Sequence, residues 1–316
     1  MVCEPTTLLE AIRFFSDPDV CVKYFAEARW PEGPVCPRCE GKDHYYLGSR
    51  RLWKCKNCAK QFSVKVGTIF EESPIGLDKW LPAIWMLTDD KNGISSWELH
   101  RGLGVTQKTA WFMLQRIRLA MQTGTFAKMA GQVEVDETFI GGKARNMHKI
   151  VRERKITGTG GKDKTLVMDL LERKGHVRAT VVTTRKRGEL HGLVQKHVEP
   201  GSEVFTDALK SYNKLGDEYP HQFIDHAEKY VEGQVHTNGL ENFWSLLKRS
   251  INGTYVSVEP FHLFRYLDEQ TFRYNERKHE QGDSGRFQTV VRRCSGKRLT
   301  YKEVTGKANV LPQDGN

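Results

Sequence analysis

Apolar and polar residues alternate in several short stretches of the second half of the chain, and a period of two predicts half-buried strands. The clearest stretch, Gln132–Ile140, ends at the glycine pair Gly141-Gly142. Four further stretches also predict strands: Thr165–Glu172, His176–Thr183, Glu203–Asp207 and Gln222–Asp225. Helices are predicted at Glu189–His197, at Ala208–Leu215 and after the last strand. Three antiparallel strands followed by alternating helix and strand predict an α/β domain.

The first half of the chain combines one alternating stretch with apolar residues at helical spacing. The alternation of Phe62–Phe70 predicts a strand, and Thr6–Phe15 predicts an opening amphipathic helix. A helix is also predicted at Lys79–Thr88, whose broad apolar face carries Trp80, Leu81, Ile84, Trp85 and Leu87. Two more helices are predicted at 95–103 and 105–118, with a glycine stop between them. A helix, a turn that contains glycine and a second helix are typical of a helix-turn-helix unit.

Four cysteines form two CxxC pairs, Cys36 with Cys39 and Cys55 with Cys58. This is the ligand spacing of a zinc ribbon, because each short turn lets two sulfurs face the same ion. Two disulfides are the alternative. The chain shows no secretory signal and has three further, scattered cysteines, Cys3, Cys21 and Cys294, which favours a reducing compartment. We therefore predict structural Zn²⁺ on the four paired cysteines.

The chain is basic, with 49 Lys and Arg against 39 Asp and Glu, a net charge of +10 and a pI near 9.2. Such a balance favours polyanionic partners. In the last helix of the helix-turn-helix unit, Lys108 and Arg116 are suited to contacts with DNA. An ordinary helical hairpin with solvated charges is the alternative. The apolar stretches are too short to span a membrane, so we expect a cytosolic protein with no membrane partner.

The predicted topology is that of a ribonuclease-H-like core. It brings together three elements, each of which carries an acidic residue. Asp136 is in the middle of the first strand, and Asp207 closes the strand expected beside it. Glu241 follows in a predicted helix, on one face with Asn238, Ser245 and Lys248. Carboxylates so placed can hold two Mg²⁺ or Mn²⁺ ions for phosphodiester chemistry.

Each of these acids also has a simpler interpretation. Asp207 could cap the helix expected from Ala208, and Glu241 could complete a capping box that begins at Asn238. Asp136 could be a solvated strand residue. Lys248 and Arg249 could be a solvated helix end, or they could bind substrate phosphates. His236 is expected to support the fold or the metal ligands rather than to act in catalysis.

Four motifs together resemble one known family. They are the two CxxC pairs, Val135-Asp136-Glu137-Thr138-Phe-Ile-Gly-Gly-Lys143, Phe205-Thr-Asp207-Ala-x-x-x-Tyr212 and His236-Thr-Asn-x-x-Glu-Asn-Phe-Trp-Ser-x-Leu-Lys-Arg249. The chain resembles, over roughly residues 20–280, the zinc-ribbon DDE transposases of ISXO-type bacterial insertion sequences, which are related to eukaryotic Merlin elements. The resemblance implies that Asp136 and Asp207 are the first two catalytic acids. It leaves the third position open between Asn238 and Glu241, and charge favours the carboxylate.

We therefore predict an α/β protein with an N-terminal zinc ribbon and helix-turn-helix followed by a ribonuclease-H-like, mixed-sheet catalytic domain. The predicted parts are residues 1–72 (helix and ribbon), 73–125 (helix-turn-helix), 130–280 (DDE domain) and 281–316 (a C-terminal tail). The expected protein binds the terminal inverted repeats of an insertion sequence, cleaves 3′ ends and joins them to target DNA in a bacterial nucleoid.

Two transposon ends must be processed together, so a homodimer or a larger oligomer is expected. A non-catalytic DNA-binding regulator is the alternative from another class. A structure-specific nuclease on the same core is a third possibility, and it would lack strand transfer.

Overall fold

The computed structural model describes residues 4–124, 127–142, 148–155, 164–224 and 236–307. The chain divides into two compact units. The first combines residues 1–122 with 276–316, and the second contains residues 123–275. The N-terminal and C-terminal parts of the chain therefore share one unit, and the strands expected in the second half form the other.

The first unit contains a small three-stranded antiparallel sheet of order β1-β2-β3 and several helices. Its elements are α1 (Leu8–Phe14), α2 (Pro18–Arg29), β1 (His44–Leu47), η1 (Gly48–Arg50), β2 (Leu52–Cys55), β3 (Gln61–Phe62), α3 (Leu77–Asp89), α4 (Ser96–Leu103), α5 (Gln107–Met121), α10 (Gly282–Arg292) and α11 (Tyr301–Val304). Local sequence explains several boundaries. Ser95 and Glu98 form a capping box at the start of α4, and Gly104 ends that helix in the left-handed conformation.

Helix α10 lies in the segment expected to be a separate tail, and it instead packs against α2, α3 and α5. The ring of Phe287 is buried and lies 5.6 Å from the ring of Phe15 and 4.9 Å from that of Trp85, between centroids. Val290 and Val291 are buried beside it on the same helix. The sequence expectation of a tail is corrected here, because this apolar face completes the core of the first unit.

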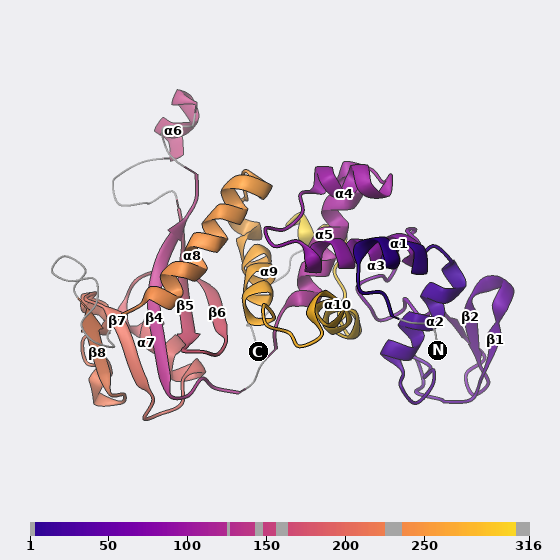
Figure 1. Ribbon diagram of the computed structural model, residues 1–316, viewed down its shortest axis with the longest axis horizontal. Coiled ribbons are helices and arrows are strands. Elements are labelled where there is room, and N and C mark those ends of the chain that lie inside the picture. The colour runs from indigo at the N-terminus through magenta and orange to yellow at the C-terminus, as the bar shows by residue number, and fades with distance from the viewer. Residues whose placement is uncertain (1–3, 125–126, 143–147, 156–163, 225–235, 308–316) are drawn as a thin grey trace. The chain divides into compact units, whose positions relative to one another are not determined.

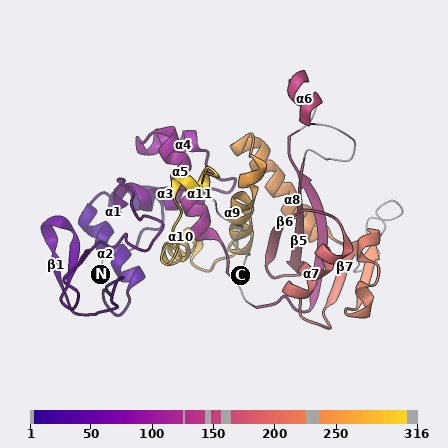
Figure 2. The ribbon, with the colours of Figure 1, turned by 180° about the vertical axis from the view of Figure 1, so that it is seen from behind.

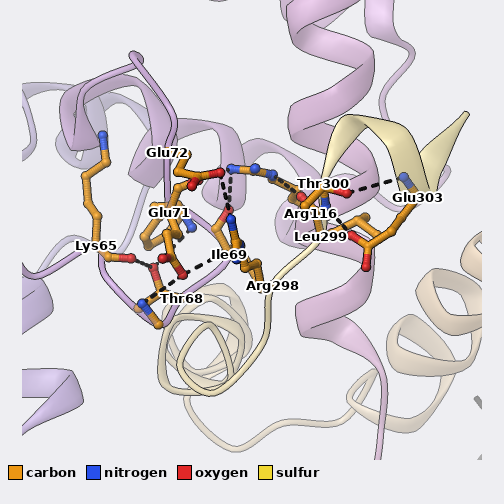
Figure 3. Close-up of polar contacts among 12 residues, drawn as sticks. Lys65, Thr68, Ile69, Glu71, Glu72, Arg116, Arg298, Leu299, Thr300 and Glu303 are labelled. Carbon is orange, nitrogen blue, oxygen red and sulfur yellow. Dashed lines mark hydrogen bonds and ion pairs between the residues drawn. The ribbon is translucent and has the colours of Figure 1, made fainter. Parts of the chain in front are cut away.

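Arg116 of α5 joins three segments of the first unit (Figure 3). Its Nη1 donates hydrogen bonds of 2.9 Å to the carbonyl oxygens of Ile69 and Glu71, and its Nε donates one of 2.9 Å to that of Leu299. Only 5% of the Arg116 surface is exposed. The guanidinium thus satisfies carbonyl groups in two loops that carry no regular structure, one after the small sheet and one before α11.

The second unit is built on a five-stranded mixed sheet of order β6-β5-β4-β7-β8. Its elements are β4 (Gln132–Ile140), α6 (Lys149–Lys155), β5 (Thr165–Glu172), β6 (Val177–Val182), α7 (Arg187–His197), β7 (Glu203–Asp207), η3 (Lys210–Tyr212), η4 (Leu215–Asp217), β8 (His221–Ile224), α8 (Asn238–Ser250), η5 (Ile251–Tyr255), η6 (Pro260–His262) and α9 (Leu263–Asn275). Strands β4, β5 and β6 are antiparallel neighbours, whereas β7 runs parallel to β4 and β8 parallel to β7.

Two apolar cores cover the two faces of this sheet. Helix α7 packs on one face through Leu190 and Val194, in a cluster with Val133 and Val135 of β4. Helices α8 and α9 cover the other face, as Figure 1 shows. Figure 2 gives the view from behind, in which α7 is also labelled. Because side chains alternate along β4, residues 134, 136, 138 and 140 face α8 and α9, and residues 133, 135, 137 and 139 face α7.

Most predicted strands of the second unit are confirmed within one residue, and two other expectations differ. The expected strand 62–70 is a strand only at Phe62, the last residue of β3, and the residues after it form turns in which the Thr68 hydroxyl donates to the carbonyl of Lys65. Short 3₁₀ turns replace the helix expected at Ala208–Leu215. The stretch between β4 and β5, residues 143–164, is rich in Lys and Arg; it contains α6, and most of its other residues lie outside the described residues.

No helix in the described part of the chain is long and apolar enough to cross a membrane.

Substituting Phe287 tests whether α10 belongs to the first unit. Phe287→Ala should lower the free energy of unfolding of this unit by about 3–5 kcal/mol, because it removes a buried ring and leaves a cavity. Tryptophan fluorescence of the full chain in denaturant measures this, since Trp85 contacts the ring. Leu9→Ala on α1, where the side chain is 57% exposed, is the control and should change stability by less than about 0.5 kcal/mol. An unchanged midpoint for Phe287→Ala would contradict the assignment.

Candidate functional site

Three aspartates lie on the α8 face of the sheet, on three neighbouring strands. Asp136 of β4 is directly opposite Asp169 of β5 in the antiparallel register. The parallel register of β4 and β7 pairs Glu134 with Phe205, and the same offset brings Asp136 level with Asp207 at the end of β7. Residues level with one another on neighbouring strands point to the same face. The predicted proximity of Asp136 and Asp207 is therefore confirmed, and Asp169 joins them.

Burial shapes the electrostatics of this cluster. Desolvation, and then the charge of Asp207, raise the pKa of Asp136 to about 8. Desolvation raises the pKa of Asp169 to about 7, although the Trp244 indole N–H donates to its Oδ2. The Asp169 Oδ1 is buried without a hydrogen-bond partner among the described residues. Crowded carboxylates in a low dielectric repel one another, and a hard divalent cation bound by oxygen ligands relieves this repulsion. The donor set therefore fits Mg²⁺ or Mn²⁺.

Asp207 also has a local structural role. Its Oδ1 accepts a 3.0 Å hydrogen bond from the backbone N–H of Leu209, which forms the turn that leaves β7. Tyr212, at the end of this turn, is buried and donates its hydroxyl to the Oε1 of Glu137. Arg185 Nη2 lies 3.0 Å from the other carboxylate oxygen of Glu137. Glu137 faces α7, so this ion pair supports the turn from behind the aspartates.

Helix α8 has the two faces that the sequence predicts. Leu240, Phe243 and Leu247 are buried against the sheet. Four other positions of the helix are exposed: Asn238, Glu241, Ser245 and Lys248. The capping box considered for Asn238 and Glu241 does not form, because the N-cap residue is Thr237 and it makes no side-chain capping bond. Glu241 is therefore left available on the exposed face.

The basic end of α8 lies within electrostatic reach of the aspartates. Burial, then the charge of Lys164, lower the pKa of Lys248, while Asp169 and Asp136 act in the opposite direction. The Lys248 ammonium is 5.6 Å from the centre of the Trp244 ring. Arg249 is exposed on the next position. Both side chains are thus on the surface of α8, and Lys248 is the one whose charge reaches the aspartate cluster.

The four paired cysteines of the first unit come together as predicted. Their sulfur atoms all lie within 4.8 Å of one another, with Sγ–Sγ distances of 3.7 Å for Cys36 and Cys58 and 3.5 Å for Cys39 and Cys55. All four are free thiols, so the disulfide alternative is not what the structure contains. Tetrahedral zinc with Zn–S bonds of about 2.3 Å places its sulfurs about 3.8 Å apart, which matches this geometry. The cluster could therefore hold zinc.

Sequence comparisons match both units. Residues 128–275 match the ISXO2-like transposase domain, and residues 16–61 match the transposase zinc-ribbon domain. A protein of the transposable element ISH50 from Halobacterium salinarum is 30% identical over 239 residues, which span 71% of this chain and 80% of that protein. The chain belongs to the ISXO2-like transposase family. A transposase-like protein of Haemophilus influenzae is 31% identical over 103 residues, which span 32% of this chain and 83% of that protein.

The two matches agree with the structure of this ISXO2-like protein. The transposase-domain match ends at Asn275, the last residue of α9 and of the second unit, and it includes the aspartate cluster and α8. The zinc-ribbon match includes all four clustered cysteines. The family domain and the second unit are therefore the same part of the chain.

The two candidate DNA contacts on α5 of this ISXO2-like protein differ in their exposure. Lys108 is exposed near the start of α5, and its ammonium lies 4.7 Å from the centre of the Tyr301 ring. Arg116 is buried and donates hydrogen bonds to backbone carbonyls. The neighbouring polar side chains Gln115 and Arg118 are also buried. Arg116 is thus a structural residue, which corrects its selection from sequence, and of these two residues only Lys108 stays a candidate DNA contact.

Sequence reasoning missed three acidic residues around the site: Glu134, Glu137 and Asp169. All three are buried. Asp169 lies in β5, whose other residues are mostly apolar, and an acidic residue in such a strand is a signal that could have found it, because burying an unpaired carboxylate is costly. Glu134 and Glu137 lie in β4 among other polar residues, so the same signal is missing there. Glu134 and Glu137 are paired with arginines, and Asp169 is not paired with one among the described residues.

The zinc cluster gives a prediction about folding. Cys58→Ser should release zinc and unfold residues 30–70, because structural zinc contributes about 10–16 kcal/mol of apparent free energy in small domains. Elemental analysis and limited proteolysis measure this. Cys21→Ala is the control, since Cys21 is buried outside the cluster, and it should keep one zinc per chain. A wild-type protein with much less than one zinc per chain would refute the prediction.

The raised pKa of Asp136 gives a prediction about pH. Between the ordinary value of 3.8 and about 8, the folded chain binds more protons at Asp136 than the unfolded chain does. The contribution of Asp136 to stability is therefore present at acid pH and is lost as the pH rises to about 8.

Without added divalent cations, Asp136→Asn should have a higher Tm than the wild type at pH 8, by about 3 °C or more, and this difference should shrink towards pH 5. Thermal unfolding at both pH values measures this, with the exposed Asp217→Asn as control. A difference that does not depend on pH would show that the carboxyl of Asp136 is not the titrating group.

Proposed function

We propose that this transposase binds the terminal inverted repeats of an insertion sequence, cleaves 3′ ends and joins them to target DNA by metal-dependent phosphodiester chemistry. One observation carries the proposal. Asp136 and Asp207 lie level with each other on neighbouring strands, on the face of the sheet that α8 covers. Neither forms an ion pair with another described residue, although Glu134 and Glu137 next to Asp136 both do. Acids kept without a positive partner in a buried cluster are suited to bind a cation.

We further propose that the second unit is a ribonuclease-H-like domain. The strand order β6-β5-β4-β7-β8, with one antiparallel half and one parallel half, supports this assignment. The first aspartate is in the central strand, and the second is the last residue of the parallel neighbour. In this arrangement Asp136, Asp207 and one residue of α8 are the metal ligands.

Two Mg²⁺ or Mn²⁺ ions bound there would activate a water or a 3′-hydroxyl and stabilise the leaving oxygen. The chain itself contributes orientation and charge. Asp136 and Asp207 are held by the strand register and by the turn at Leu209. Lys248 and Arg249, exposed on α8, are placed to bind phosphate oxygens of the DNA strand.

The third ligand is proposed to be Glu241. Both Asn238 and Glu241 are exposed on the same face of α8, so position alone does not separate them. A carboxylate neutralises the charge of Mg²⁺ better than an amide does. The absence of the capping box also leaves the Glu241 carboxylate without that competing local role.

The first unit is proposed to bind DNA. The cysteine cluster would hold structural Zn²⁺, and α4 and α5 would form the helix-turn-helix, with Lys108 on the exposed start of its second helix. The basic charge of the chain supports a DNA partner. Because two element ends must be joined, we propose a homodimer or larger assembly. The regulator alternative would not require two neighbouring aspartates that form no ion pair with another described residue.

The metal site gives the principal prediction for catalysis. Asp207→Asn should retain the fold and DNA binding but lose both 3′-end cleavage and strand transfer, by about 10²-fold or more, because an amide cannot supply the charge that holds the cations. Cleavage of a labelled terminal-repeat duplex in Mg²⁺ and in Mn²⁺ measures the first step, and joining to a plasmid measures the second. Cleavage without joining in the wild type would favour a nuclease.

Two variants on α8 separate the candidate third ligands. Glu241→Gln should be as inactive as Asp207→Asn, whereas Asn238→Ala should only slow cleavage. Both positions are exposed, so neither change should unfold the protein. The reverse order of activities would assign the third ligand to Asn238.

The DNA-binding prediction uses the full chain, because α10 belongs to the first unit. Lys108→Ala should weaken binding to the terminal repeat and reduce the slope of log affinity against log salt by about 1, as expected for one lost phosphate contact. Fluorescence anisotropy at several salt concentrations measures both. Equal affinity of the wild type for terminal and random duplexes at every salt concentration would refute specific recognition.

A further inference from the structure

Glu134 is a buried acid on the α8 face of the sheet, two residues before Asp136 on β4. Only 1% of its surface is exposed. Its Oε2 accepts a 3.1 Å hydrogen bond from the backbone N–H of Leu240, and its Oε1 accepts one of 3.0 Å from Arg173 Nε. The Glu134 side chain of β4 thus binds the first turn of α8 directly. Burying a carboxylate is costly, and these hydrogen bonds offset that cost. The presence of a buried, fully paired acid at this position therefore needs an explanation.

The first turn of α8 depends on this contact because the helix has no cap of its own. Thr237 at the N-cap makes no side-chain capping bond, which leaves the first N–H groups without a local acceptor. The carboxylate of Glu134 supplies an acceptor and a negative charge at the positive end of the helix. Gly239 permits this approach, since a Cβ there would lie 2.3 Å from Leu171 Cδ2 and 2.8 Å from Glu134 Oε2.

Arg173 extends the contact to the other elements of the site. Its Nη2 donates a 2.8 Å hydrogen bond to the carbonyl of His236, just before α8. Its guanidinium lies 4.1 Å from the centre of the Phe205 ring, two residues before Asp207 on β7. The His236 Nδ1 is 3.4 Å from Glu134 Oε1. The pair of Glu134 and Arg173 therefore touches β4, β7 and the start of α8, which are the three elements that carry the candidate metal ligands.

We propose that Glu134 is a positioning residue: together with Arg173 it fixes the first turn of α8 on the sheet and so sets the position of Glu241 and Asn238 relative to Asp136 and Asp207. Glu134 does not bind the cation in this scheme. The inference rests on the proposed metal-dependent function and adds the device that assembles its ligand set. It also assigns Gly239 a role, because the close approach requires a residue without a side chain.

Two variants disturb this contact by different means. Glu134→Gln keeps the shape but removes the charge that pairs with Arg173, and Gly239→Ala pushes the helix from the sheet without changing charge. Glu269→Gln is the matched control, because Glu269 is also a buried acid, paired with Arg273 of the same unit but on α9. It should lower thermal stability as much as Glu134→Gln does while leaving cation binding unchanged.

Binding of Mn²⁺ to the full-length protein is measured by electron paramagnetic resonance, with Asp136→Asn defining non-specific binding. Cleavage of the terminal-repeat duplex is measured across Mg²⁺ concentrations. Both Glu134→Gln and Gly239→Ala should weaken specific Mn²⁺ binding, and raise the Mg²⁺ concentration for half-maximal cleavage, by about tenfold, as loss of residues that orient metal ligands commonly does.

The proposed function and the positioning role of Glu134 can be refuted separately. If the wild type binds no more Mn²⁺ than Asp136→Asn and cleaves no DNA, the proposed function is wrong. If the wild type binds Mn²⁺ and cleaves, but Glu134→Gln and Gly239→Ala match Glu269→Gln in both assays, the positioning role is wrong and the ion pair serves stability alone.

Discussion

The crowding of aspartates on one face of the central strands is the constraint on which the second unit depends. Asp136 and Asp169 are directly opposite each other, and Asp207 lies level with Asp136 on the next strand. Like charges directly opposite in a sheet are destabilising, and burial adds a desolvation cost that raises the pKa of Asp136 to about 8. A chain selected only for stability would not place these groups together. Their placement together is the physical basis for proposing this face as the active face.

The surroundings of the cluster distribute charge unevenly. Glu134 on the same face is neutralised by Arg173, and Glu137 on the opposite face is neutralised by Arg185 and by the hydroxyl of Tyr212. Among the described residues, arginines thus pair with the acids on either side of Asp136, and none pairs with Asp136 itself. Tyr212 had no assigned role in the sequence motif, and the structure gives it one in supporting the turn after Asp207. Ion pairs around the site hold strands and turns in place, while Asp136 and Asp207 form no ion pair with another described residue.

The sequence predicted most of the fold where the signal was local. Alternation over Gln132–Ile140 defined the central strand, and the cysteine spacing predicted the observed cluster. Errors arose where partners lie far away in sequence. The segment that contains α10 was expected to be a tail, because the partners of its apolar face, Phe15 and Trp85, are in the first hundred residues. Arg116 looked like a DNA contact because sequence does not reveal that carbonyls of Ile69 and Leu299 surround it.

The candidate site shows the same division. Asp136, Asp207 and the two faces of α8 could be predicted, because strand and helix periodicities fix which side chains share a face. Asp169 stands out as an acid in an apolar strand, but its position opposite Asp136 depends on the register between β4 and β5, which the sequence does not show. The contact of Glu134 with the start of α8 joins residues more than a hundred positions apart, and only the folded chain shows it.

The central claim is that the aspartate cluster and α8 form one cation site for DNA chemistry. Anomalous X-ray diffraction from crystals of the full-length protein with terminal-repeat DNA and Mn²⁺ tests it most directly. The account predicts anomalous density bridged by the carboxylates of Asp136 and Asp207, next to a DNA phosphate and within reach of Glu241. Manganese bound elsewhere, with these two carboxylates free or held by basic side chains, would contradict it.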